Sequence, residues 1–394
     1  MQKVLSNLIS NKSLAIFTAL LFFFNFLSKL LKEIFSVRIS LYPSTVLKLS
    51  AVGLLFIYFI MYLRNKKFAR YIYAVIIIFG IDLLIKIVQE VPSHVLFNRS
   101  YFFFKGIFFF LLIVGLRDFE KKDLEKPINV LFFIGKLNLA LILVGAFFDI
   151  NLFKSYPHTD RFGFNGIMAE PGISTYFYML LAILSYLRYR YLDYSYWTTI
   201  FMLVAIVFLG TKSGYLFIGI LVLIQILYLL KKRAYQISFI AVILISGFVL
   251  KDKLIQLAIN SFNFGTYLYE KHGLLTFITS KRDLLLQDTI AYINENWSAV
   301  QYITGGMDFR IHRVEFEFID IFLFFGIIGV CLYLLLLKKT FLANKPKALY
   351  VILFLVFLFV CSLGGNLFFS TTNSFCFVVV FLYASKSLST ANKL

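Results

Sequence analysis

Five cations fall in the polar stretches that separate apolar runs of this chain, and they are Arg161, Lys212, Arg282, Arg310 and Arg313. Guanidinium groups make paired hydrogen bonds to phosphate and keep their charge in a dry site. Positioned cations also stabilise the charge that develops on a departing pyrophosphate. The sequence therefore predicts an anion site that suits a phosphate or pyrophosphate at the surface of a membrane.

Three side chains in the same polar stretches could accept a proton from an attacking hydroxyl, namely Glu170, His312 and His158. Glu170 precedes Pro171, so we expect extended geometry at the start of a helix, where the dipole favours a carboxylate. A simple helix-start charge remains an alternative for Glu170. The sequence shows no Walker loop, nucleophile elbow or metal-ligand cluster, and we expect neither a metal nor a cofactor.

The composition indicates which elements must position these residues. Apolar types make up 60% of the 394 residues and charged types only 15%, whereas soluble domains have about 45–50% and about 25%. These values exclude an ordinary soluble enzyme. Runs of about 20 apolar residues recur and predict an all-α, polytopic membrane protein. The twelve predicted spans are 13–31, 44–63, 71–91, 100–116, 128–149, 171–187, 195–210, 213–230, 235–250, 318–337, 348–364 and 373–385.

The net charge of +19 follows the predicted topology. Of the 39 Lys and Arg residues, 21 lie in alternate loops and the two termini, and nine lie in the short loops on the opposite side. The positive-inside rule then places both termini in the cytoplasm. We expect the plasma (inner) membrane as the location of the protein. Nucleic acid is not expected as a partner, because the basic clusters are spread over separate segments rather than forming one face.

We treat residues 1–394 as a single transmembrane domain with one long extracytoplasmic loop, 251–317, between helices nine and ten. Within 281–303 the apolar residues step by three and four positions, which predicts an amphipathic helix on the membrane or across the mouth of the bundle. Gly305-Gly306 then predicts a turn. The apolar residues of this predicted helix are Leu286, Ile290, Ile293, Trp297 and Val300.

Few charges are predicted inside the membrane. Asp82 and Lys86 are four residues apart, so they are expected to pair on one helix face. Lys136 and Asn138 lie in another predicted span, where ionisable groups are functional candidates. Lys212 lies in Gly210–Gly214, a predicted hairpin at the outer surface, and an anchoring role at the interface is the simpler interpretation for it.

Four short motifs occur in a recognisable order along the chain. Arg161 has Gly172 eleven positions on, and Thr211-Lys212-Ser213-Gly214 joins two central helices. The long loop holds an Arg, a Gly pair and a His in sequence, and Gly326-Ile327-Ile328-Gly329 follows in the next helix. With these motifs the sequence resembles the Wzy-type O-antigen and exopolysaccharide polymerases, which are related to the O-antigen ligases. It departs from them in having Lys212 in place of the usual Arg, and in lacking a second Arg with a Gly eleven on in the long loop.

The resemblance implies a glycosyltransferase acting on oligosaccharide repeat units carried by undecaprenyl pyrophosphate. A hydroxyl of one unit would attack the anomeric carbon of the chain on another lipid, and undecaprenyl pyrophosphate would leave. Arg282 would serve in catalysis, with His312 or Glu170 as base. The pyrophosphate would be held by Arg161, Lys212, Arg282, Arg310 and Arg313. Membrane lipid, a polysaccharide chain-length regulator and a repeat-unit flippase are the other implied partners.

Two alternatives stay open. An O-antigen ligase uses the same donor but transfers glycan to a lipid A core. A transporter, such as a flippase for lipid-linked oligosaccharide, usually places polar groups at the bilayer midplane in broken helices and repeats. The polar groups here gather on one predicted face, and this favours the enzyme.

Overall fold

Helices build the described part of the chain. The computed structural model describes residues 11–35, 42–64, 66, 68–157, 159, 161–260, 263–343 and 346–390. The helices are α2 (Asn11–Glu33), α3 (Pro43–Tyr58), η1 (Phe59–Leu63), α4 (Ala69–Val88), α5 (Ser93–Leu116), α6 (Lys121–Phe147), η2 (Asn151–Phe153), α7 (Pro171–Leu192), α8 (Trp197–Leu209), α9 (Lys212–Leu229), α10 (Arg233–Val249), α11 (Lys251–Asn260), α12 (Asn263–Thr279), α13 (Arg282–Asn296), α14 (Ala299–Thr304), α15 (Glu317–Phe341), α16 (Ala348–Gly364) and α17 (Thr371–Thr390).

Two helices, α7 and α17, form the centre of the bundle. Every residue of α7 from 173 to 188 is buried, and so is every residue of α17 from 371 to 384. They pack on each other, while α5 and α6 lie against α17 and α16 lies against α7. A helix covered on all sides needs no polar face, which explains why apolar residues run right around both helices.

Each predicted span coincides with a helix, but the helices differ in how well they suit a bilayer. Seven described helices are long and apolar enough to cross a membrane: α2, α3 continued by η1, α4, α5, α6, α9 and α15. The apolar helices α8, α10 and α16 are shorter. Since α7 and α17 face protein rather than lipid, they tolerate more hydroxyl groups. The chain is thus a multi-pass helical membrane protein, and the count of twelve spans stays a prediction.

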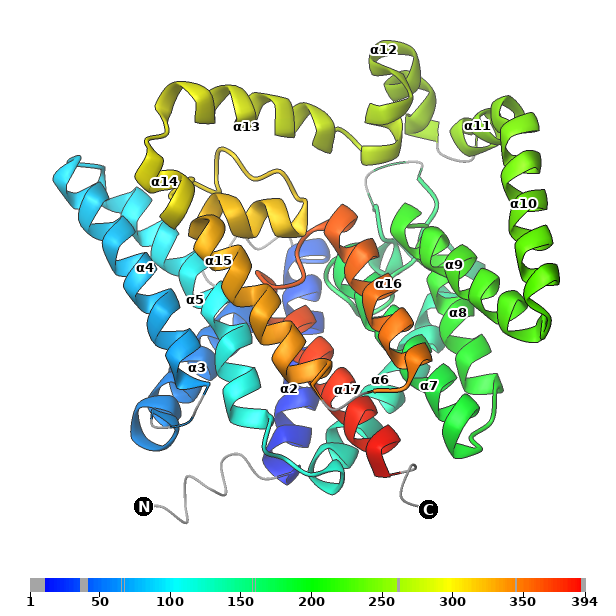
Figure 1. Cartoon of the computed structure of the whole chain (residues 1–394), viewed down its shortest axis with the longest axis horizontal. Helices are drawn as coiled ribbons and strands as arrows, with labels where there is room; N and C mark the ends of the chain where they lie inside the picture. Colours follow the sequence, from blue (N-terminus) through cyan, green and yellow to red (C-terminus); the bar gives the residue numbers. More distant parts are fainter. Residues whose placement is uncertain are drawn as a thin grey trace.

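The ends of the bundle differ in the segments they carry (Figure 1). The start of α2 and the end of α17 lie at one end, and α12 and α13 lie at the opposite end. The α5–α6 connection with its neighbouring basic residues, and the end of α7, whose last turns hold Arg188 and Arg190, lie toward the end of α17. This arrangement is the one that the charge pattern predicts. Which end faces the cytoplasm stays a prediction, and we call the α13 end the predicted outer end.

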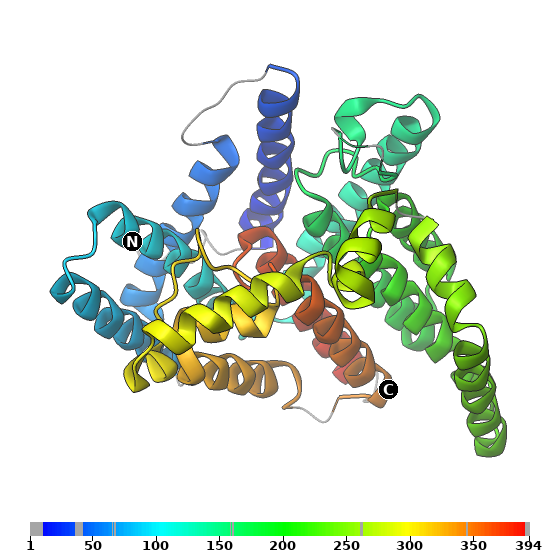
Figure 2. The ribbon, with the colours of Figure 1, turned by 90° about the horizontal axis from the view of Figure 1, so that it is seen from above.

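The predicted outer loop 251–317 contains four helices, α11 to α14. Seen from above, α13 crosses over the ends of the other helices (Figure 2). The single helix expected over 281–303 is divided, because α13 ends at Asn296 and Ser298 begins α14 with a capping box closed by Gln301. Of the expected apolar face, Ile293 is buried, Leu286 and Trp297 pack on the core, and Ile290 and Val300 are exposed.

Candidate functional site

A buried ion pair ties the predicted outer segment to the bundle. Arg99 of α5 donates from Nε to Asp82 of α4 (2.9 Å) and from Nη1 to the carbonyl oxygens of Gly306 and Met307 (2.7 and 3.0 Å). The expected pairing of Asp82 with Lys86 is therefore wrong, and Lys86 donates to a glutamine side chain instead. Arg99 lies inside α5, which begins seven residues before the predicted span 100–116. A guanidinium can bind a carboxylate and two carbonyls at once, whereas an ammonium cannot match that planar geometry.

Two glycines meet where this segment crosses α15. The helix α15 is broken at Gly326, whose φ of +66° is in the left-handed region. The freed carbonyl of Leu323 accepts hydrogen bonds from the N–H groups of Gly306 and Met307 (3.1 and 3.0 Å). A Cβ on Gly305 would collide with the backbone of α15, and a Cβ on Gly326 with the carbonyl of Ile303. The two glycine motifs of the sequence thus allow one close backbone crossing.

Two buried carboxylates at the start of α15 organise the neighbouring turns. Glu317 accepts hydrogen bonds from two consecutive backbone N–H groups of the α16–α17 turn (2.6 and 2.5 Å). Asp320 accepts from the N–H groups of Val314 and Glu315 (3.1 and 3.2 Å) and from Nε of Arg313 (3.2 Å). Their hydrogen bonds satisfy both carboxylates within the fold, so we assign them a structural role.

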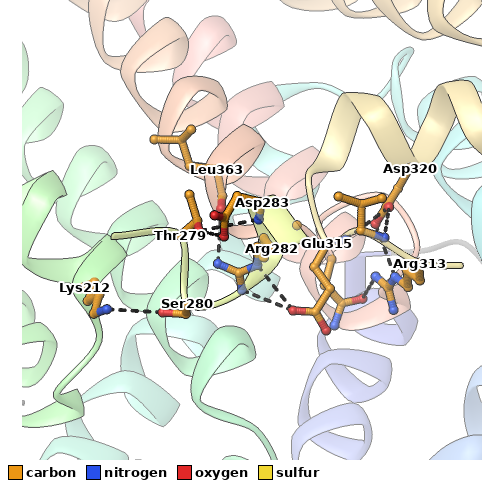
Figure 3. A network of polar contacts seen from close by, with 12 residues as sticks. Lys212, Thr279, Ser280, Arg282, Asp283, Arg313, Glu315, Asp320 and Leu363 are labelled. Atoms are coloured by element: carbon orange, nitrogen blue, oxygen red, sulfur yellow. Dashed lines mark hydrogen bonds and ion pairs between the residues drawn. The ribbon is translucent and has the colours of Figure 1, made fainter. Parts of the chain in front are cut away.

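Arg282 and Lys212 lie in one polar network (Figure 3). Arg282 forms an ion pair with Glu315 (3.2 Å) and donates to the carbonyl of Leu363 (3.2 Å). Lys212 donates to the hydroxyl of Ser280 (3.3 Å), which lies two residues before Arg282 in the chain. Three cations therefore lie within electrostatic range of one another, because the charge of Lys212 interacts with those of Arg161 and Arg282.

Arg161 reaches the same cluster from the loop before α7. Its Nη2 donates to the carbonyl of Gly210 (3.2 Å), and its guanidinium lies 4.0 Å from the centre of the Tyr156 ring. Burial raises the pKa of Tyr156, and the nearby charges of Arg161 and Arg282 only partly oppose this rise. Gly210 has a φ of +67°, so the hairpin predicted from its sequence brings α9 and its first residue, Lys212, close to Arg161. We call Arg161, Lys212 and Arg282 the cation cluster.

A cavity of about 390 Å³ lies between α2, α3, α5 and the starts of α7 and α17, and no residue of the cation cluster lines it. Ligand pockets have volumes of about 300–1,000 Å³. The charged side chains that line it are Lys29, Lys32, Lys48, Lys105, Glu33 and Glu170. Four cations against two carboxylates give its lining a positive charge inside a largely apolar bundle. We call it the lysine cavity.

Of the four lysines of this cavity, Lys32 forms an ion pair with Glu33 (3.5 Å), and the other three form no ion pair with any described residue. Lys29 and Lys48 each donate to an asparagine side chain (2.6 and 2.9 Å). Lys105 lies 4.2 Å from the centre of the Tyr101 ring, and no hydrogen bond or ion pair joins it to any residue that the structure describes. An ammonium that makes no hydrogen bond or ion pair in such a site is suited to an anionic or strongly polar ligand.

Glu170 stands at the wall of the lysine cavity. It precedes α7 with the extended geometry that the following proline predicts, at a φ of −136°. Its charge interacts with those of Lys48 and Lys105. Within the described ranges its carboxylate accepts no hydrogen bond, so both oxygens are available to a ligand.

Arg313 connects the lysine cavity to the cation cluster. It donates to Asn366 (3.2 Å), which lines the cavity, and its charge interacts with that of Lys105. On its other side Asp320 orients both Arg313 and the backbone of Glu315, the partner of Arg282 (Figure 3). Polar contacts thus lead from Asn366 in the cavity lining through Arg313, Asp320 and Glu315 to Arg282 of the cation cluster, and we call this series the polar track.

The remaining predicted residues lie elsewhere or outside the description. His312 stacks on Tyr292 of α13, with ring centres 4.3 Å apart. The side chain of Arg310 is exposed, and its backbone N–H donates to Asp308 (3.0 Å). His158 lies outside the described residues. The structure therefore brings Glu170, rather than His312, to a lined cavity.

Sequence reasoning did not identify Lys29, Lys48 and Lys105 as site residues, although they fall within the predicted spans 13–31, 44–63 and 100–116. One signal could have found them, because Lys48 and Lys105 stand inside apolar runs on the side that the positive-inside rule leaves poor in cations. Among the described residues, no three His, Cys, Asp or Glu side chains come together as a metal site.

Comparisons of the chain with protein-family models, curated proteins and solved structures gave no significant match. The resemblance to Wzy-type polymerases therefore depends on the motifs of the chain itself. The structure brings Arg161 close to the hairpin that contains Lys212, and it brings the glycine pair of the long loop close to Gly326 of the fourth motif.

Proposed function

We propose that this protein is a polysaccharide polymerase that joins undecaprenyl-pyrophosphate-linked repeat units on the outer face of the plasma membrane. The observation that carries the proposal is the lysine cavity, with Glu170 in its wall and the polar track leading to the cation cluster. Charged groups inside an apolar bundle are costly and usually mark a substrate site. O-antigen, capsule or exopolysaccharide repeats are the substrates that the resemblance implies.

The proposed reaction is a displacement at an anomeric carbon. The hydroxyl oxygen of the acceptor sugar forms a bond to that carbon, and the bond from the carbon to the pyrophosphate oxygen breaks. The electron pair of the broken bond leaves with undecaprenyl pyrophosphate. The hydroxyl proton passes to the carboxylate of Glu170, whose oxygens have no hydrogen-bond donor within the described part of the chain.

The cation cluster is suited to the leaving group. Arg282 has a carboxylate partner in Glu315, but that glutamate is half exposed, with 52% of its side chain accessible. A pyrophosphate carries more charge than one carboxylate, so it can displace Glu315 from the guanidinium. Arg161 and Lys212 add two further charges beside Arg282, and together they would stabilise the pyrophosphate as it departs.

The test is the surface glycan of a strain that lacks the gene and carries single variants. Glu170→Gln should remove the base and reduce long-chain glycan by about 10²–10⁴-fold. Arg282→Gln and Arg161→Gln should also shorten the glycan. Glu295→Gln, an exposed carboxylate of α13, serves as the matched control and should leave the glycan unchanged. Normal chain length in the first three variants, at normal protein level, would overturn the proposal.

The deletion strain separates the polymerase from its alternatives. A polymerase deletion leaves surface glycan of one repeat, whereas a ligase deletion leaves polymer on undecaprenyl pyrophosphate. A flippase deletion would retain lipid-linked repeats on the inner face. The broken helix α15 is a feature that transporters share. Here, however, backbone of the Gly305 turn fills the break, and this favours an enzyme.

A further inference from the structure

A second cavity, of about 330 Å³, lies between α6, α7 and the connection to α8. Arg188 in its lining is about 27 Å along α7 from Glu170, at 1.5 Å per residue. The cavity is therefore separate from the proposed catalytic site and lies toward the predicted inner end. Its polar lining consists of Asn129, Lys136, Ser185, Arg188, Ser195 and Thr198.

Arg188 is buried in this lining, with 8% of the residue exposed. Its guanidinium lies about 5 Å from the centres of three rings, those of Phe132 (5.0 Å), Tyr194 (5.2 Å) and Tyr383 (4.9 Å). The rings attract the positive charge, but they accept no conventional hydrogen bond. The side chain has no hydrogen bond or ion pair with any described residue, and its Nε is buried and unsatisfied.

A buried guanidinium without an acceptor is strongly unfavourable, so a missing anionic partner is the physical explanation we favour. Asn129, Phe132, Phe133 and Lys136 recur at helical spacing on one face of α6. Lys136 is exposed in an apolar stretch, beside exposed Phe133 and Leu137. In a bilayer this face of α6 would contact lipid. Lys136 forms no hydrogen bond or ion pair with any residue in the described ranges.

We propose that this cavity binds the phosphate of an anionic phospholipid from the predicted inner leaflet. Arg188 offers a planar pair of donors to the phosphate oxygens, and Lys136 adds a second charge at the lipid-facing side. Ser195 accepts a hydrogen bond from a backbone N–H (3.4 Å), so its own hydroxyl proton remains available to the phosphate. Basic pockets between transmembrane helices on the cytoplasmic side recognise acidic head groups in this way.

The site should prefer phosphatidylglycerol to phosphatidylcholine. Both lipids carry a phosphate, but the choline cation would be repelled by Arg188 and Lys136. Native mass spectrometry of the delipidated full-length protein, titrated with each lipid, measures the preference. The wild type should bind phosphatidylglycerol at least about tenfold more tightly, because its head group has a net negative charge whereas that of phosphatidylcholine is neutral overall.

Variants test the assignment to these residues. Arg188→Gln and Lys136→Gln should each lose the preference, while Arg190→Gln should keep it. Arg190 is a matched control, because it belongs to the same basic cluster but lies on the Tyr228 ring (3.4 Å) rather than in the cavity. Lys136 is exposed, so its variant remains informative if Arg188→Gln does not fold.

Three results would overturn the proposal. Equal binding of the two lipids by the wild type would exclude recognition of an acidic head group. An equal loss of the preference for phosphatidylglycerol in Arg188→Gln and Arg190→Gln would exclude this cavity as the binding site. Stabilisation by inorganic phosphate in phosphatidylcholine nanodiscs, as large as that by phosphatidylglycerol, would assign the site to a soluble anion. None of these measurements depends on polymerase activity.

Discussion

Replacing Arg99 by Met should destabilise the protein by at least about 4 kcal/mol. Asp82 is 3% exposed and would lose its partner, which costs about 3–5 kcal/mol in a buried pair. The carbonyls of Gly306 and Met307 would also lose their donor, and each buried unsatisfied group costs about 1–3 kcal/mol. Since whole domains are stable by only about 5–15 kcal/mol, the effect is large.

A double variant separates the ion pair from the backbone contacts. Asp82→Leu combined with Arg99→Met removes the orphaned carboxylate and should recover about 3 kcal/mol relative to Arg99→Met alone. Lys86→Gln is the matched control on α4, and it should change stability by no more than about 0.5 kcal/mol. The control also tests the pairing that sequence spacing predicts, because a true Asp82–Lys86 pair would make Lys86→Gln the costly change.

The assay is reversible unfolding of the purified protein in mixed micelles, followed by far-UV circular dichroism. Amide hydrogen exchange over 299–316 gives a local measurement, since Arg99 holds this segment through two carbonyls. Arg99→Met should increase exchange there. Equal stability of Arg99→Met and wild type would refute the reasoning, and so would a double variant that is less stable than the single one.

Two further predictions concern α15 and the predicted outer loop 251–317. Gly326→Ala should destabilise the protein by more than about 1 kcal/mol in the same unfolding assay, because φ is +66° and its Cβ would strike the carbonyl of Ile303. Gly80→Ala, with open space at its Cβ, should stay within about 1 kcal/mol of wild type, and an equal loss in both variants would contradict the argument. Burial raises the pKa of Asp283, but hydrogen bonds from two threonine hydroxyls outweigh it and hold the pKa below the ordinary 3.8. Its carboxylate therefore stabilises the fold above about pH 4, and this contribution is lost as pH falls through the lower folded value. The difference in Tm between wild type and Asp283→Asn should shrink from pH 6 to pH 3, and a constant difference would show that the carboxylate charge is not involved.

Several features of the fold were predictable from the sequence because they depend on local properties. A helix that crosses a bilayer needs about 20 apolar residues, so hydropathy alone locates it. For the same reason every predicted span coincides with a helix. The geometry of Glu170 was also predictable, since Pro171 restricts the residue before it.

For the candidate site, the sequence predicted the individual cation-bearing segments but not that they lie together. The motifs around Arg161, Lys212 and Arg282 each indicated a cation in a predicted outer loop, and the structure joins them in one cluster. The same reasoning kept His312 as an alternative to Glu170 for the base, because a histidine is chemically suitable wherever it lies. His312 stacks on the ring of Tyr292, which belongs to α13. No pattern in the sequence around His312 predicts this contact.

The sequence by itself therefore determined that this is a multi-pass helical membrane protein, where its helices lie, and which loops carry cations. Only the tertiary structure decided which charges meet. Lys29 binds Asn165 across 136 residues, and Arg99 binds Gly306 across 207. Such pairs depend on how each helix is rotated and on which helices pack together. Hydropathy and residue spacing are properties of one segment at a time, so they do not contain that information.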